Sequence, residues 1–449
     1  MSSWPQLREA RTVYPARESG AVVRCGVSDL ILANTSASLV FFFRQPLDDA
    51  KLADGLSQAL ARVPVFAGRL RAAGDRLEIV CAGGGAQLMT YDVDESIGEA
   101  IGRAAMPGTG LADHVDAPRA RAGGDPLLTV RVSRLSDGGT ALGCSWHHAV
   151  GDMQSFMLLM RAWSAAVEQG EPPQVRILED PDAYLDQVLP AEGAGRTGFR
   201  LLDQQQQASL DADVEAAIRS SRTVQAYFGE AEVARMRRDA EAAAGRRLSA
   251  NDVLCGHVVA AIRRLDEDTQ ARSLAMPVNI RRHAGIAPSV VGNLVGEIFL
   301  TCAPGSAPAA IAAQVRAAVD DFARSHLAFR ASRAQLAELG PGRFGDVMPI
   351  GFDVPNRTFT FTNWSRFGLY DITFGGQRPV LFSPAARLQV PWTSLLTEGF
   401  GQAGYFLTIS VPGRLAARLR GQDGRALLHR HREPADVLPE LAGQVRKLI

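Results

Sequence analysis

The sequence has few cysteines, almost no lysine and no long hydrophobic run. Its five cysteines are scattered and never form a CxxC pair, which argues against a disulfide framework or a zinc site and favours a reducing compartment. The strongest apolar run, residues 37–43, is too short to span a bilayer and is typical of a buried strand. The first residues lack a charged-then-apolar signal pattern, so we expect a cytoplasmic protein with no membrane partner.

The charge balance and the absent motifs exclude further classes. Lysine occurs only at Lys51 and Lys447, and arginine brings the basic residues to 48, equal to the 48 acidic residues. This balance gives no indication of a nucleic-acid partner. No GxGxxG, GxxxxGK[ST] or HExxH motif occurs, so nothing predicts a dinucleotide, P-loop or zinc-protease site. The eight histidines lack ligand spacing, and we expect no metal and no resident cofactor.

The length and the pattern along the chain predict two domains. A chain of 449 residues is long enough for two cores. Strand-like and helix-like runs alternate in residues 1–180 and are mixed again in residues 223–449, without a sequence repeat between the two. Residues 181–222 contain proline, glycine and a QQQQ tract, and they show little periodicity. We therefore expect an N-terminal domain, a crossover linker and a C-terminal domain with these boundaries.

One short stretch suggests chemistry. In "GCSWHHAVGDM" His147 and His148 are adjacent, and Asp152 follows His148 by four residues. A strand-like run precedes them and an amphipathic helix pattern follows, so His148 could face a central space and accept a proton from a hydroxyl or amine. Alternatively, the histidine packs in the core and Asp152 only caps the helix. Ser145 is a poor nucleophile candidate, because His147 stands where a nucleophile elbow needs glycine.

"HHAVGD" resembles the HxxxD motif of the BAHD acyltransferases, and the resemblance covers nearly the whole chain. Further segments are similar to the family in the same order, and the crossover lies where the family has one. These segments are "VYPARESG…VRCGVSDL", "DPLLTVRVSRLSDGGTALGCSW", "NIRRHAGIAPSVVGNLVGE" with its Gly292-Asn293 pair, and "FTNWSRFGLYDITFGGQRPV". HxxxD alone is a weak pattern, whereas four ordered segments are specific.

The resemblance implies an α/β fold of two similar chloramphenicol-acetyltransferase-like domains, each a mixed sheet with helices. A tunnel between them would admit an acyl thioester, usually acyl-CoA as co-substrate, from one face and a small-molecule alcohol or amine from the other. His148 would deprotonate this acceptor in a ternary complex, without an acyl-enzyme. We expect a monomer that acts in specialised metabolism.

The resemblance also implies roles for residues around the base. Asp152 would order the loop, often by pairing with an arginine, and is therefore a structural residue. Thr362 and Trp364 match positions near the reacting carbonyl, where the indole N–H could donate to the oxyanion. The alternative for Trp364 is a buried tryptophan whose N–H is satisfied within the core.

The sequence departs from the family pattern at two places. Met153 replaces the glycine that usually follows the motif, which places a flexible side chain near the pocket. The DFGWG motif is degraded at residues 373–377, so the aspartate that pairs with the family's arginine is absent. Either Asp371 substitutes as the partner of Arg281, or Arg281 is free to bind the phosphates of the donor.

Two alternatives to a CoA-dependent enzyme remain open. One is a condensation-type acyltransferase that takes its acyl group from a carrier protein, since the motif of those domains also fits "HHAVGD". The other is a non-catalytic binding protein of the same fold, which the degraded DFGWG motif would permit.

Overall fold

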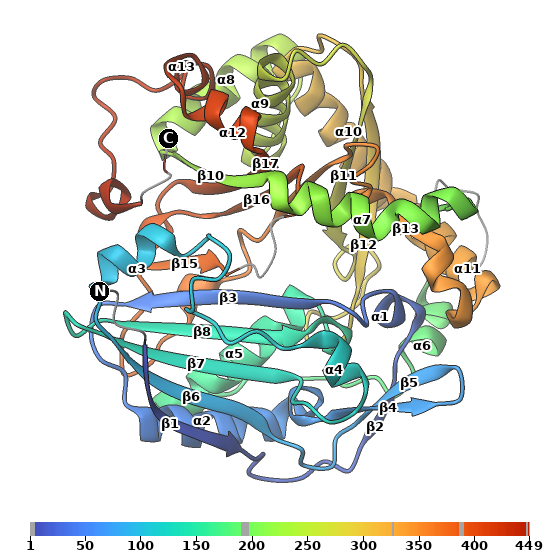
Figure 1. The fold of residues 1–449 in the computed structure, drawn as a ribbon, viewed down its shortest axis with the longest axis vertical. Coiled ribbons are helices and arrows are strands. Elements are labelled where there is room, and N and C mark those ends of the chain that lie inside the picture. Colours follow the sequence, from blue (N-terminus) through green and yellow to red (C-terminus); the bar gives the residue numbers. More distant parts are fainter. Residues whose placement is uncertain (1–4, 190–196, 326, 386–389, 446–447, 449) are drawn as a thin grey trace.

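Two six-stranded sheets organise the molecule, and helices pack against both (Figure 1). The computed structural model describes residues 5–189, 197–325, 327–385, 390–445 and 448. The first sheet lies in the lower, mainly blue and teal half of Figure 1, and the second in the upper, mainly green to red half. The expected α/β fold of two sheet-rich domains is confirmed.

The first sheet has the strand order β1-β6-β7-β8-β3-β15. It is mixed, since β6 and β7 are parallel while β7 and β8 are antiparallel. Helices α2 (Asp49–Arg62) and α5 (Met153–Glu168) cover one face, and α3 (Ile97–Arg103) packs on the other. The strands are β1 (Gln6–Val13), β6 (Ala86–Val93), β7 (Leu128–Leu135), β8 (Thr140–His147), β3 (Ser36–Phe43) and β15 (Leu381–Pro384).

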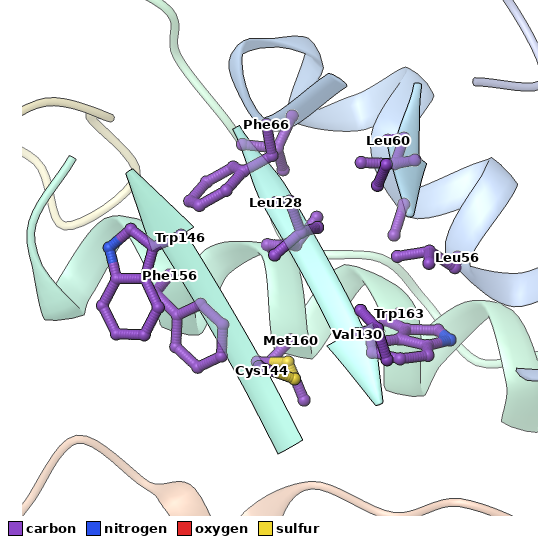
Figure 2. Close-up of a cluster of buried hydrophobic side chains, with 14 of the residues drawn as sticks. Leu56, Leu60, Phe66, Leu128, Val130, Cys144, Trp146, Phe156, Met160 and Trp163 are labelled. Carbon is purple, nitrogen blue, oxygen red and sulfur yellow. The ribbon is translucent and has the colours of Figure 1, made fainter. Parts of the chain in front are cut away.

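The core between this sheet and α5 follows from the helical spacing of large apolar residues (Figure 2). Trp146 of β8 stacks on Phe156 of α5 with ring centroids 4.2 Å apart. Trp163, two turns farther along α5, donates its indole N–H to the carbonyl of Leu52 in α2 at 2.8 Å. Met153, the first residue of α5, is buried in this core. These contacts fix the direction in which α5 leaves β8.

The second sheet has the order β10-β17-β16-β14-β11-β12 and is also mixed, with β14 parallel to both β11 and β16. Its strands are β10 (Ser221–Phe228), β17 (Tyr405–Pro412), β16 (Thr393–Glu398), β14 (Phe359–Asn363), β11 (Arg272–Asn279) and β12 (Val295–Cys302). Its helices are α8 (Glu230–Ala244), α9 (Ala250–Leu265), α10 (Pro308–Ser325), α11 (Leu327–Leu339), α12 (Gly413–Arg420) and α13 (Gln422–Leu428). Among the described residues, none of the helices combines the length and the apolar character needed to cross a membrane.

Smaller elements surround the boundary between the domains. The short helix α1 (Val27–Ile31) contacts both α11 and the 3₁₀ helix η2 (His148–Val150). The other small elements are β2 (Val22–Arg24), β4 (Arg69–Ala73), β5 (Arg76–Val80), α4 (Ala117–Arg121), β13 (Val347–Pro349), η1 (Pro64–Ala67), η3 (Pro341–Asp346), η4 (Ile350–Phe352), η5 (Leu369–Asp371), η6 (Phe400–Gln402) and η7 (Glu440–Gln444). The α1 helix thus links the turn after β8 to the second domain.

The crossover is more regular than its sequence indicates. The expected linker contains α6 (Pro181–Val188), β9 (Phe199–Leu201) and α7 (Gln204–Ser220). The QQQQ tract forms the first turn of α7, where Asp203 and Gln206 make a capping box. Helix α7 buries none of its residues, so it lacks the apolar stripe by which a helix is recognised in a sequence.

One segment of the expected C-terminal domain belongs to the other sheet. Strand β15 pairs antiparallel with β3 and so extends the first sheet, although residues 223–449 were assigned to the second domain. The segment leading to β15 contains the degraded DFGWG motif. Its Phe374 is 1% exposed and contacts Trp163 and Phe43 with ring centroids 5.1 and 5.9 Å apart. The second half of the chain therefore contributes to the core of the first domain.

We predict that Phe374→Ala lowers the free energy of unfolding by about 3–5 kcal/mol, because it leaves a cavity between two aromatic rings. Chemical denaturation followed by tryptophan fluorescence measures this loss. The control is Phe352→Ala, at a phenylalanine that is 44% exposed, which should change stability by less than about 1 kcal/mol. Equal effects of the two substitutions would contradict the role of this segment in the core.

Candidate active site

The turn between β8 and α5 carries the HxxxD residues. Strand β8 is buried along its whole length and ends at His147, and His148 begins η2. Gly151 has φ 149°, and a Cβ at this position would lie 2.5 Å from the Cβ of Ser155. Only glycine fits here. The turn thus delivers Asp152 to the N-cap of α5, where its Oδ1 accepts hydrogen bonds from the backbone N–H and the hydroxyl of Ser155, both at 3.0 Å.

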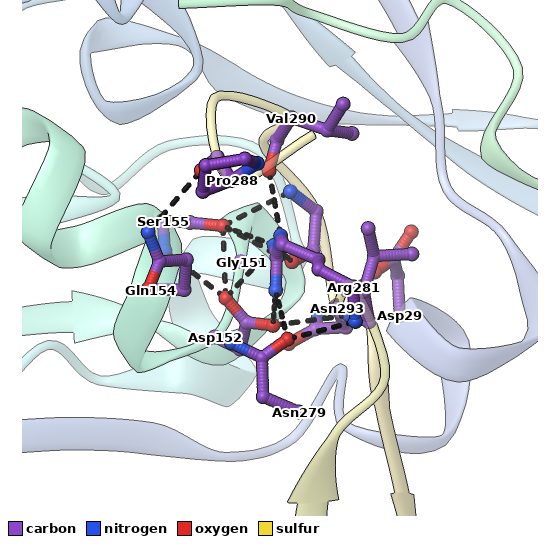
Figure 3. Close-up of polar contacts among 12 residues, drawn as sticks. Asp29, Gly151, Asp152, Gln154, Ser155, Asn279, Arg281, Pro288, Val290 and Asn293 are labelled. Atoms are coloured by element: carbon purple, nitrogen blue, oxygen red, sulfur yellow. Dashed lines mark hydrogen bonds and ion pairs between the residues drawn. The ribbon is translucent and has the colours of Figure 1, made fainter. Parts of the chain in front are cut away.

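Asp152 also forms a bidentate ion pair with Arg281 of the second domain (Figure 3). The guanidinium donates from Nη1 to Oδ2 at 2.7 Å and from Nη2 to Oδ1 at 3.1 Å. Asp152 is 4% exposed and Arg281 is 2% exposed. A buried pair of this kind is maintained only when the remaining donors and acceptors are also satisfied.

The other donors of Arg281 are satisfied by the chain around it. Nε donates to the carbonyl of Val290 at 2.9 Å, Nη1 to Oδ1 of Asn279 at 3.1 Å, and Nη2 to the carbonyl of Gly292 at 2.9 Å. Both expectations for Arg281, a pair with Asp371 or a free guanidinium, are therefore wrong. Asp371 is exposed at the end of η5, two residues before the segment 373–377.

Asn293 connects this ion pair to His148. The backbone N–H of Leu294 donates to Oδ2 of Asp152 at 3.1 Å, which brings the preceding residue, Asn293, beside the turn. Oδ1 of Asn293 lies 3.1 Å from Nδ1 of His148. The amide Nδ2 donates at 2.7 Å to the carbonyl of His148 and at 2.7 Å to Oδ1 of Asp29 in α1. With two acceptors on Nδ2, the amide has one favourable orientation, so Oδ1 accepts the Nδ1–H of His148.

This network leaves one ring nitrogen of His148 available. With the proton on Nδ1, Nε2 has a lone pair, and no described residue donates a hydrogen bond to it. Burial lowers the pKa of His148, which keeps the ring neutral near pH 7 and able to accept a proton. Asp29 is also buried, and burial raises the pKa of its carboxyl to about 7. The sequence does not predict a role for Asp29 or Asn293, because Asn293 reaches His148, and Asp29 reaches Asn293, from distant parts of the chain.

His147 has a different environment from its neighbour. Its side chain is 0% exposed, and its Nδ1 accepts the backbone N–H of Ala149 at 3.1 Å. Burial lowers the pKa of His147 to about 4, so the ring is neutral. The two interpretations of the histidine pair therefore apply to different residues. His147 is the packed histidine, while His148 has a free nitrogen at the junction of the domains.

Comparison with protein-family models identifies the family of this chain. The model described as the Transferase family matches residues 7–396. The chain belongs to this family, the BAHD acyltransferases. It is therefore an acyltransferase, and the non-catalytic alternative is set aside.

Individual relatives of this BAHD acyltransferase are distant but match over nearly their full length. It is 24% identical over 444 residues to rosmarinate synthase of Plectranthus scutellarioides, covering 90% of this chain and 96% of the relative. It is 25% identical over 413 residues to putrescine hydroxycinnamoyltransferase of Oryza sativa subsp. japonica, covering 84% and 89%. Its fold is similar to that of F. graminearum TRI101 complexed with ethyl coenzyme A, with TM-score 0.70, 13% identity and coverage of 93% and 98%.

The remaining candidate residues of this BAHD acyltransferase are Thr362, Trp364 and Cys144. Thr362 is on β14 and Trp364 follows it, and neither forms a hydrogen bond with His148 or the HxxxD turn among the described residues. Trp364 is partly buried against the core of the first domain, and no described residue accepts its indole N–H. Cys144, the cysteine nearest to His148 in the sequence, is buried in that core, and burial raises the pKa of its thiol far above the usual range.

We predict that Asp152→Ala lowers the free energy of unfolding by about 3–5 kcal/mol, since it leaves the buried charge of Arg281 without its partner. Activity should fall along with stability. Thermal denaturation and initial rates measure the two effects. The control is Asp92→Ala, which removes an exposed ion pair with Arg8 and should cost less than about 1 kcal/mol. A fully stable but inactive Asp152→Ala enzyme would assign Asp152 a direct chemical role.

Proposed function

We propose that this enzyme transfers an acyl group from acyl-CoA to the hydroxyl or amine of a small-molecule acceptor, with His148 as the general base. The observation that carries the proposal is the arrangement of the His148 ring. Its Nδ1–H is held by Asn293 at 3.1 Å, while Nε2 has no partner among the described residues. A neutral imidazole with one anchored and one free nitrogen is the form that accepts a proton from an alcohol or amine.

The proposed reaction balances without a covalent enzyme intermediate. Nε2 of His148 takes the proton of the acceptor O–H or N–H while the acceptor atom attacks the thioester carbonyl. The tetrahedral intermediate then expels the thiolate, which takes the proton back from the imidazolium. The free indole N–H of Trp364 is our candidate donor to the oxyanion. Thr362, on the strand β14 that ends just before Trp364, is a candidate positioning residue.

Two further features of the proposal concern the partners. We choose CoA over a carrier protein because TRI101, which is complexed with a CoA derivative, matches this fold with TM-score 0.70, whereas the first condensation domain of the CDA synthetase matches it with TM-score 0.59. CoA would serve as a co-substrate, and no resident cofactor is needed for the proton transfers described. We propose a monomer, since His148 and Asp152 from the first domain and Arg281 and Asn293 from the second all come from one chain.

We predict that His148→Ala lowers the turnover number on the order of 10²–10⁴-fold, the usual effect of losing a general base. The fold should survive, because His148 contributes no buried ion pair. Steady-state rates and circular dichroism of the purified variant measure the two quantities. The matched control is His147→Ala, which should reduce turnover much less. An inactive His147→Ala enzyme and an active His148→Ala enzyme would reverse the assignment.

A kinetic prediction separates direct transfer from a covalent mechanism. Direct transfer requires donor and acceptor to be bound together, so double-reciprocal plots should intersect. A cysteine or serine nucleophile would give parallel lines and an acylated protein. Mass spectrometry of enzyme mixed with acyl-CoA in the absence of acceptor should therefore show no adduct. An acyl group on Cys144 under these conditions would overturn the ternary-complex mechanism.

A further inference from the structure

Glu297 is a carboxylate on β12, four residues after Asn293, the asparagine that holds the base. Asn293 binds the Nδ1 of His148 just before β12 begins. Along β12, Glu297 alternates with Gly296, Ile298 and Leu300, which lie at the positions between. Ile298 and Leu300 are buried in the core of the second domain. Because side chains alternate along a strand, Glu297 lies on the face of β12 opposite this core.

The Glu297 carboxylate lies between two glycines. A Cβ at Gly198, just before β9, would be 2.8 Å from Oε2, and a Cβ at Gly351 of η4 would be 2.8 Å from Oε1. Ser332 of α11 is next to Gly198 and accepts its backbone N–H at 2.8 Å. Any larger residue at either glycine would displace the carboxylate. The crossover and η4 thus enclose Glu297 while leaving its side chain partly exposed.

No described residue compensates this charge. Glu297 forms no hydrogen bond and no ion pair among the described residues, and burial alone raises the pKa of its carboxyl to about 7. Glu232 shows the usual solution for a buried carboxylate, since it binds His429 at 2.8 Å and Arg432 at 3.1 Å. A desolvated carboxylate without donors is destabilising, and such groups are concentrated at functional sites.

We propose that Glu297 binds a protonated amino group of the acceptor, an assignment that rests on the acyl transfer proposed above. A cationic nitrogen supplies both the opposite charge and the N–H donors that the chain withholds from this carboxylate.

The position on β12 also describes the shape of the acceptor. Glu297 follows Asn293 by four residues, so their Cα atoms are at most roughly 14 Å apart. An acceptor with its nucleophile at His148 and its cation at Glu297 is therefore an elongated molecule with functional groups at both ends. Linear diamines and chains ending in an amine have this form.

The binding test uses a series of linear α,ω-diamines, each paired with the n-alkylamine of the same length that lacks the second nitrogen. Calorimetric titration of the full-length enzyme without donor should give a dissociation constant roughly 10- to 100-fold lower for the best diamine than for its monoamine. Glu297→Gln should abolish this difference. The control is Glu215→Gln, which removes an equal charge from the exposed surface of α7 and should leave the difference intact.

The kinetic test repeats the comparison with acyl-CoA present, by measuring kcat/KM for each member of a pair. The diamine preference should fall roughly 10- to 100-fold in Glu297→Gln and not in Glu215→Gln. A wild-type enzyme that acylates monoamines but shows no Glu297-dependent preference for diamines overturns this inference and leaves the proposed function standing. Glu297-dependent diamine binding without transfer to any acceptor overturns the proposed function instead. A preference that persists in Glu297→Gln also refutes the inference.

Discussion

Asp152 and Arg281 bring opposite charges from different domains into the interior, where either charge alone would cost several kcal/mol. The pair is stable because nearly every remaining donor and acceptor has a partner, including the carbonyls of Val290 and Gly292. Its geometry fixes the start of α5 relative to the chain that follows β11. The junction of the two domains therefore has one arrangement at the HxxxD turn.

The same junction sets the chemical state of His148. The chain segment that supplies acceptors to Arg281 continues through Asn293, whose amide orients the imidazole of His148. The first domain alone holds His148 but not the group that fixes its tautomer. The loss of the DFGWG aspartate leaves this junction intact because Arg281 has its partner in Asp152. The altered segment instead anchors Phe374 in the core of the first domain.

Carboxylates in the interior of this enzyme thus differ in how their charge is compensated. Asp152 is paired with a guanidinium, and Asp29 accepts hydrogen bonds from Asn293 and Gly26. Both hold the chain in place. Glu297 has no such partners within the described chain, which sets it apart from these structural groups and makes it the candidate contact for an acceptor.

The sequence by itself determined the family, through its resemblance in four ordered segments, and with the family the fold class. It also determined the position of the turn, because strand alternation and helical spacing are recorded in neighbouring residues. It also indicated that His148 and Asp152 have different roles. Only the tertiary structure decided the partner of Arg281, the role of Asn293, the placement of β15 in the first sheet and the isolation of Glu297. Each of these depends on packing between segments far apart in the chain, which local periodicity does not encode. Helix α7 is not predicted from the sequence, because it buries no face and therefore has no periodic apolar residues.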